Sequence, residues 1–205
     1  MQTFWKQAVF SMMGMIALTG AGAHAQTDIS ASVFGTLNNS TSGNGATQSS
    51  ANSGGGMIGL RHIVAPLLGF EANFAVSGAS QSLAPIPGSC GFRCNNPPLN
   101  VSADALEFTV NYVASAKVGK LEPFGTAGLG FTYFNATGSE IGLNSLSRPT
   151  WVGGCGADWN LTSRVGLRLQ YRVNFYKAPD VVFGYAQTGA FVHTQEPMVG
   201  IFFRM

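Results

Sequence analysis

The chain has 205 residues, of which 10% are charged, against roughly 25% in an average soluble domain. So few charges would make a poor soluble surface, and a formal net charge of +2 leaves no basic patch for nucleic acid. The length allows one domain and is marginal for two.

The first 25 residues have the features of an export signal. Lys6 and the free amino group give a positive start, an apolar run covers residues 8–23, and Ala23-His24-Ala25 fits a small-x-small cleavage site. A membrane-spanning helix is the alternative. However, small and polar residues interrupt this run, and no other apolar run approaches the roughly 20 residues that such a helix needs. We expect a signal peptide over residues 1–25 and one mature domain over residues 26–205.

The mature part alternates apolar and polar side chains with a period of two, which indicates strands whose two faces meet different surroundings. The alternation is clear in residues 68–77, 105–112, 164–172 and 198–205. Glycine and aromatic residues blur it in residues 27–37, 56–62, 121–134 and 150–159. No segment after residue 25 sustains a helical period of 3.6, so the sequence predicts eight strands and little or no helix.

The connections between these strands alternate in length. Long segments rich in Asn, Ser, Thr, Gly and Pro cover residues 38–55, 78–102, 135–149 and 174–197. Short links cover residues 63–67, 113–120 and 160–163. Long loops at one end and short turns at the other are typical of outer-membrane barrels. The fold class we predict is all-β, an eight-stranded antiparallel up-and-down transmembrane β-barrel.

The charges decide which face of the strands meets lipid. A soluble barrel of the lipocalin type would show the same alternation with its apolar face inward, but it would need a densely charged exterior. On the four clear strands every charge lies on one face, which also carries small residues such as Gly69 and Gly166. A basic residue at the lipid midplane costs roughly 2–4 kcal/mol, so this face is expected to line the lumen. The predicted lumen charge network is Arg61, Glu71, Glu107, Asp158, Arg164, Arg168, Arg172 and Arg204.

Aromatic residues are predicted to form belts where the barrel leaves the membrane. The rings lie toward predicted strand ends, where interfacial girdles are found, and ordinary core packing is the alternative. They are Tyr112, Tyr133, Trp151, Trp159 and Tyr171.

Three cysteines are unevenly placed: Cys90 and Cys94 share one long loop, and Cys155 lies on a predicted strand. Export to an oxidising compartment favours a local Cys90–Cys94 disulfide with Cys155 free. A zinc site would need four ligands at regular spacing, and His62 and His193 are far from this loop in sequence. We predict no metal site and no cofactor.

Two segments resemble a known family. Residues 163–172, SRVGLRLQYR, and residues 196–205, EPMVGIFFRM, are similar to strands of OmpA-like outer-membrane β-barrel proteins. The resemblance, which extends over the mature chain, implies an eight-stranded meander inserted by the barrel-assembly machinery. Met205 departs from the usual terminal Phe of the family, although Phe202 and Phe203 are present. No segment resembles the peptidoglycan-binding domain that some relatives carry after the barrel.

Three functional hypotheses remain at this stage. Eight strands leave a lumen just wide enough for side chains, so the charge network either plugs the barrel or rearranges to open a narrow channel. Some eight-stranded barrels are lipid A-modifying enzymes with a Ser/His site. Here His193 is expected in the last long loop, and Ser80, Ser82 and Ser139 are expected in other outer loops, without a local motif that joins them.

We therefore predict a non-enzymatic, monomeric outer-membrane protein. Its role would be envelope-structural or surface interaction through four long outer loops. The expected partners are outer-membrane lipid, lipopolysaccharide and, during insertion, the assembly machinery; nucleic acid is not among them.

Overall fold

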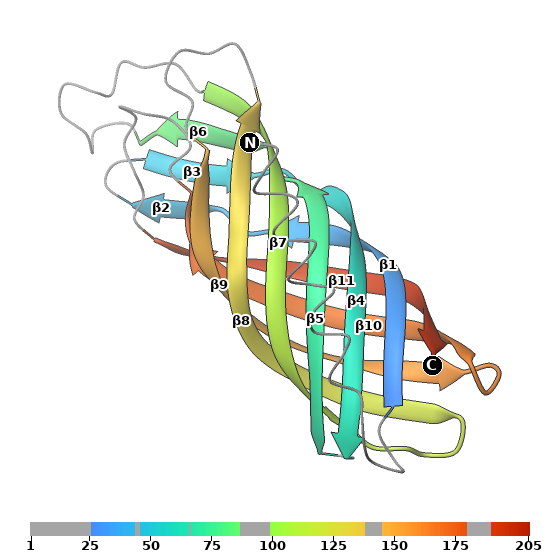
Figure 1. The fold of residues 1–205 in the computed structure, drawn as a ribbon. Helices are drawn as coiled ribbons and strands as arrows, with labels where there is room; N and C mark the ends of the chain where they lie inside the picture. Colours follow the sequence, from blue (N-terminus) through green and yellow to red (C-terminus); the bar gives the residue numbers. More distant parts are fainter. Residues whose placement is uncertain (1–25, 44–45, 66, 87–98, 138–144, 180–189) are drawn as a thin grey trace, which may run out of the picture.

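The computed structural model describes residues 26–43, 46–65, 67–86, 99–137, 145–179 and 190–205, and every regular element in these ranges is a β-strand. Eight long strands pair antiparallel, each with the next, and the last pairs with the first, so the sheet closes into a barrel (Figure 1). They are β1 (Gln26–Asn38), β4 (Ser53–Ala65), β5 (Leu68–Gly78), β7 (Leu99–Ser115), β8 (Leu121–Thr137), β9 (Leu146–Asn160), β10 (Val165–Lys177) and β11 (Phe191–Arg204). The predicted eight-stranded antiparallel barrel is confirmed. No helix in the described ranges is long and apolar enough to cross a membrane.

Three short strands extend the barrel wall at one end. They are β2 (Thr41–Gly43), β3 (Ala46–Ser50) and β6 (Gln81–Pro85), and they pair in the order β2-β3-β6-β7 (Figure 1). We call this the long-loop end, and we call the opposite end, where β4–β5, β7–β8 and β9–β10 are joined, the short-turn end. We expected residues 38–55 and 78–102 to form loops. This prediction is wrong for β2, β3 and β6, which lie within them. Their Ser, Thr and Gln residues put polar side chains on both faces, so the sequence shows no apolar–polar alternation here even where a side chain such as Gln48 is buried.

Several strands also reach further toward the long-loop end than the alternation predicts. β7 begins at Leu99, β10 continues to Lys177, and β11 begins at Phe191. Pro197 lies inside β11 and is paired with Tyr171 of β10. A proline has no N–H to give to a sheet, which is why the sequence suggested a loop up to this residue.

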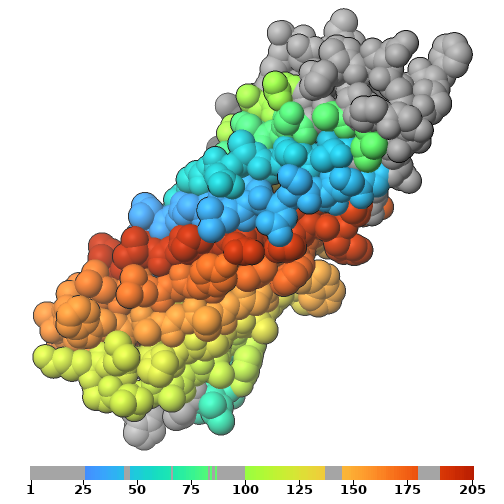
Figure 2. All heavy atoms as spheres, turned by 180° about the vertical axis from the view of Figure 1, so that it is seen from behind, coloured from blue at the N-terminus to red at the C-terminus, as the bar shows by residue number. Residues whose placement is uncertain are grey.

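The outer wall is apolar and the lumen is polar. The outward side chains include Ile58, Leu129, Leu169, Val199 and Ile201, all exposed, whereas neighbouring positions on the same strands carry buried charges. Exposed apolar and buried charged side chains reverse the usual arrangement of a water-soluble domain. Figure 2 shows part of this wall, with the strands side by side and β1 (blue) directly next to β11 (red). The predicted orientation of the faces is therefore confirmed.

The five aromatic residues of the expected belts are all exposed on this wall. Trp159 is the last residue but one of β9, in agreement with a belt at the short-turn end. Tyr171 instead lies midway along β10, so its predicted place at a strand end is wrong. The reason is that β10 does not stop at Arg172 but continues to Lys177.

Candidate functional site

Four side chains form a square of ion pairs across the lumen, nearer the short-turn end. The sheet register sets Arg61 opposite Glu71 on β4 and β5, and the Arg61 Nε to Glu71 Oε2 distance is 2.5 Å. On the opposite wall, Arg168 and Asp158 are paired on β10 and β9 by two hydrogen bonds, of 2.7 and 2.8 Å. Two contacts cross the lumen: Arg61 Nη1 to Asp158 Oδ2 at 3.0 Å, and Arg168 Nη1 to Glu71 Oε2 at 3.5 Å. All four side chains are almost completely buried.

A further arginine extends this square toward the short-turn end. Arg204 pairs with Asp28 at 3.1 Å and with Glu122 at 3.2 Å. Its side chain is 14% exposed, so these two ion pairs lie at the short-turn end next to solvent. We call these seven residues the inner cluster: Asp28, Arg61, Glu71, Glu122, Asp158, Arg168 and Arg204.

Two inward aromatic rings pack against the arginines of the inner cluster. The Arg61 guanidinium carbon lies 4.0 Å from the centre of the Phe124 ring, and that of Arg204 lies 5.4 Å from the Phe202 ring. Arg168 is 5.5 Å from both rings. These cation–π contacts stabilise guanidinium groups that are withdrawn from water. Glycines leave room for the rings, because a Cβ on Gly166 would lie 2.3 Å from Phe202 Cζ.

A second group of side chains, the outer cluster, lies closer to the long-loop end and consists of Glu107, Arg172, Asn174 and Glu196. Arg172 Nη2 donates a hydrogen bond to Glu107, and the Asn174 amide donates to both carboxylates, at 2.7 Å to Glu107 and 2.9 Å to Glu196. Arg172 Nε is 3.7 Å from Glu196 Oε2, which is too long for a hydrogen bond. Two carboxylates thus share one guanidinium.

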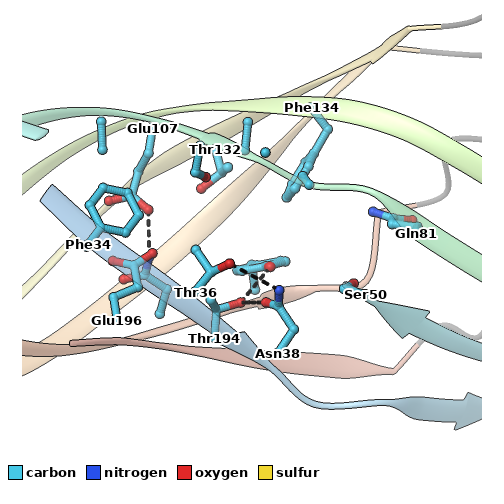
Figure 3. A pocket seen from close by; sticks show the side chains of 17 residues that line it. Phe34, Thr36, Asn38, Ser50, Gln81, Glu107, Thr132, Phe134, Thr194 and Glu196 are labelled. Carbon is cyan, nitrogen blue, oxygen red and sulfur yellow. Dashed lines mark hydrogen bonds between the residues drawn. The ribbon is translucent and has the colours of Figure 1, made fainter. Parts of the chain in front are cut away.

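A small pocket of about 30 Å³ lies next to the outer cluster, with space for roughly two water molecules. Figure 3 shows Phe34, Glu107 and Glu196 gathered at one end of this pocket and Gln81 at the other. Between them, Thr194 Oγ1 donates to the Asn38 side-chain oxygen at 2.9 Å. Among the described residues, buried ion pairs fill the lumen at the inner cluster, and this pocket lies beside the outer cluster.

Of the eight charges predicted for the lumen, the structure places seven there, five in the inner cluster and two in the outer cluster, and it places Arg164 elsewhere. Arg164 is exposed in the turn before β10, so its predicted place in the network is wrong. The sequence prediction began this strand at Arg164, whereas β10 begins one residue later, at Val165, and Arg164 belongs to the preceding turn.

Sequence reasoning missed Asp28, Glu122 and Glu196. Asp28 alternates with Ile29 and precedes Ser30 and Ser32 on the same face, so the pattern could have revealed it. Glu196 lies two residues before Met198 on the inward face, but Pro197 hid the continuity of β11. Glu122 is only the second residue of β8, where the pattern is too short to assign a face.

The cysteines and the histidine of the enzyme hypothesis are placed as follows. Cys155 is a free, exposed cysteine on β9, as predicted, whereas Cys90 and Cys94 lie outside the described residues. His193 is on β11 and not in a loop, because that strand begins at Phe191. Asn39 Nδ2 donates to His193 Nε2, and the imidazole packs 6.1 Å from the Phe175 ring, centre to centre.

Residues 11–192 match the family model of the outer membrane protein beta-barrel domain. The chain belongs to this family. As a member, it is an outer-membrane protein, and its short turns face the periplasm while the long-loop end faces outward. No curated protein matches the sequence.

Several solved structures share the fold of this outer-membrane barrel. OprG of Pseudomonas aeruginosa is similar with a TM-score of 0.61 at 13% identity, over 87% of this chain and 95% of that one. Ail of Yersinia pestis, solved with the heparin analogue sucrose octasulfate, gives 0.53 at 13% identity, over 88% and 99% of the two chains. Neisserial surface protein A gives 0.52 at 12% identity, over 90% and 99%. At such low identity these likenesses show the fold alone.

Proposed function

We propose that this protein is a non-enzymatic outer-membrane barrel with a closed lumen, which supports the envelope and presents its long-loop end for surface interactions. The observation that carries the proposal is the square formed by Arg61, Glu71, Asp158 and Arg168. It joins opposite walls of the barrel with four ion pairs, so it both fills the lumen and ties the walls together.

Opening the barrel would require these ion pairs to separate inside the lumen. Charges withdrawn from water are costly unless they are paired, and a buried charge that loses its partner costs about 3–5 kcal/mol. Because each arginine of the square has at least two carboxylate partners, a conducting pathway would break several pairs at once. A resting closed state follows from this cost.

The strand extension at the long-loop end supports the surface role. β3 pairs with β6, and β6 pairs with β7, so the extension continues the barrel wall as an ordered sheet beyond the apolar zone. Its side chains include Ser42, Thr47 and Ser49, which offer hydroxyl groups to a partner. We expect lipopolysaccharide and outer-membrane lipid to be the nearest partners of a monomer inserted by the assembly machinery after cleavage of residues 1–25.

A narrow channel is the second candidate, and the pocket beside the outer cluster favours it. Recordings in planar lipid bilayers test the two functions against each other. The unmodified protein should show little steady conductance. The double variant Arg61→Ala with Arg168→Ala, which removes both cationic corners of the square, should conduct more. Large and stable currents from the unmodified protein, lost when lumen charges are changed, would establish the channel instead.

An enzyme with a Ser/His site has less support. The hydrogen bond of His193 in the described part of the chain is with Asn39 and not with a serine hydroxyl. A histidine that activates a serine must lie within hydrogen-bond reach of it, and such geometry can be looser in an apo protein. We therefore propose no catalytic role for His193.

A further inference from the structure

Three basic side chains project from the short-turn end of the barrel, and we call them the basic rim: Lys117, Lys120 and Arg164. Lys117 and Lys120 lie in the turn between β7 and β8, and Arg164 lies in the turn between β9 and β10. Both turns are at the end of the barrel opposite β2, β3 and β6 (Figure 1). All three residues are exposed, and their side chains form no ion pair or hydrogen bond with other described residues.

Hydrogen bonds hold the two turns side by side. The backbone N–H of Asn160 donates to the carbonyl oxygen of Lys120 at 2.9 Å, and the Asn160 side-chain amide donates to the same oxygen at 3.3 Å. In the next turn, the Arg164 carbonyl oxygen accepts from the backbone N–H of Arg204 at 2.7 Å, and the Arg164 N–H donates to Thr162 Oγ1 at 3.2 Å. The backbone of the basic rim is thus fixed, while its long side chains extend into solvent.

No exposed carboxylate side chain among the described residues neutralises the basic rim. The turns themselves, residues 116–120 and 161–164, contain no acidic residue. The acidic side chains of the neighbouring strand ends are buried in the lumen and paired with arginines of the inner cluster. They are Asp28, Glu71, Glu122 and Asp158. The basic rim therefore offers three positive charges to an anionic partner.

Exposed apolar residues place the basic rim at the edge of the bilayer. Lys120 immediately precedes Leu121, the first residue of β8, which is exposed on the outer wall. Arg164 immediately precedes Val165, the first residue of β10, which is exposed as well. Trp159 is paired with Leu121, and tryptophan is enriched where a membrane meets water. The cations thus lie at the level where lipid headgroups follow the acyl chains.

The turns also carry apolar side chains of their own. Val118 lies between the two lysines, and Leu161 begins the β9–β10 turn; both are exposed. Basic and apolar residues together on one surface are typical of proteins that contact an anionic lipid surface. A polar polymer such as peptidoglycan would pair with the cations but not with Val118 and Leu161. The mixed surface therefore favours lipid.

We propose that the basic rim binds the phosphate groups of acidic phospholipids in the periplasmic leaflet of the outer membrane. Each Lys or Arg near a membrane surface strengthens the attraction for anionic lipid roughly fivefold. This binding is distinct from the surface interactions of the long-loop end, and it requires neither a closed nor an open lumen. Its failure would leave the proposed function untouched.

Two tryptophans of β9 provide a reporter and its control. Trp159 lies beside the basic rim, and Trp151 lies further along the same strand toward the long-loop end. Full-length protein with Trp5→Phe and either Trp151→Phe or Trp159→Phe is refolded in vesicles of phosphatidylcholine and phosphatidylglycerol, one of which is brominated on its acyl chains. At equal mole fraction, brominated phosphatidylglycerol should quench Trp159 more strongly than brominated phosphatidylcholine does. The two lipids should quench Trp151 equally.

Charge-neutral variants show whether the basic rim causes this preference. The triple variant Lys117→Gln, Lys120→Gln and Arg164→Gln should lower the relative association of phosphatidylglycerol at Trp159 from at least about fivefold to near unity. The matched control is Lys177→Gln, which removes an exposed cation at the long-loop end and should keep the preference. Anomalous mobility of unboiled samples on gels shows that each variant has folded.

Three results would overturn the proposal: equal quenching of Trp159 by the two lipids, the same preference for phosphatidylglycerol at Trp151, or a preference at Trp159 that survives in the triple variant. Equal quenching together with sedimentation of the protein on purified peptidoglycan, lost in the triple variant, would assign the basic rim to that polymer instead. The comparison of the two tryptophans keeps all three cations in place, so it decides the question even where the triple variant does not fold.

Discussion

Glu107 and Arg172 are paired inside the lumen, and Arg172 has no exposure to solvent. Replacing Glu107 with Ala leaves the guanidinium of Arg172 with one distant carboxylate, Glu196 at 3.7 Å. Because a buried charge without its partner costs about 3–5 kcal/mol, we expect a loss of this size in the free energy of unfolding. Urea unfolding in lipid vesicles, followed by tryptophan fluorescence, measures it.

Two further variants show whether this loss comes from the unpaired charge. Adding Arg172→Met to Glu107→Ala should recover part of the stability, since no guanidinium is then left unpaired. Arg164→Ala, at an exposed turn position, should change the free energy of unfolding by less than about 0.5 kcal/mol. Equal losses for Glu107→Ala and Arg164→Ala would show that the lumen pairs do not stabilise the barrel.

At the scale of elements, β10 carries a glycine on which the packing of the inner cluster depends. A Cβ on Gly166 would lie 2.3 Å from Phe202 Cζ and 2.5 Å from the Trp159 carbonyl oxygen. Gly166→Ala should therefore destabilise the barrel by roughly 1–3 kcal/mol, the usual cost of overpacking. Gly153→Ala on β9 is the control, because its Cβ would meet nothing within 4 Å. The same unfolding measurement should find the control unchanged, and a similar loss in both variants would contradict this packing.

The outward face of β10 gives a prediction for the membrane zone. Leu169 is 60% exposed in the middle of the strand, whereas Leu161 is 46% exposed in the turn at the periplasmic end. Leu169→Arg should lower the free energy of unfolding in vesicles by roughly 2–4 kcal/mol, and Leu161→Arg by at most about 1 kcal/mol, because the cost of a cation depends on its depth in lipid. Equal costs at the two positions would mean that Leu169 is not in the bilayer core.

The whole molecule combines an apolar wall, a closed sheet and a filled lumen, which fits the outer membrane to which its family belongs. After expression in a Gram-negative host, the protein should fractionate with outer membranes, and unboiled samples should migrate anomalously on gels because the closed barrel resists detergent. Intact-mass measurement should find a mature chain that begins at Gln26. Recovery as a soluble periplasmic protein would contradict the membrane assignment.

Period-two alternation, together with the alternating lengths of the connections and the placement of the charges, was sufficient to predict the barrel, its orientation and most of its lumen charges. One face of a membrane strand contacts lipid and the other contacts a crowded polar interior. Adjacent residues therefore differ in polarity, as apolar Leu169 and charged Arg168 do. The same reasoning failed in β2, β3 and β6, whose sequences show no apolar–polar alternation, and at the strand limits near Arg164 and Pro197. In these segments the sequence shows no difference in polarity between the two faces of a strand.

Only the tertiary structure decided which charges meet. Arg61 and Asp158 are 97 positions apart in sequence, yet they form an ion pair, because barrel closure sets β4 and β9 on opposite walls of one narrow lumen. The ion pair of Arg204 with Asp28 likewise depends on closure, because it joins the last strand, β11, to the first strand, β1. A local pattern determines which way a side chain points, whereas strand register and closure determine what it touches.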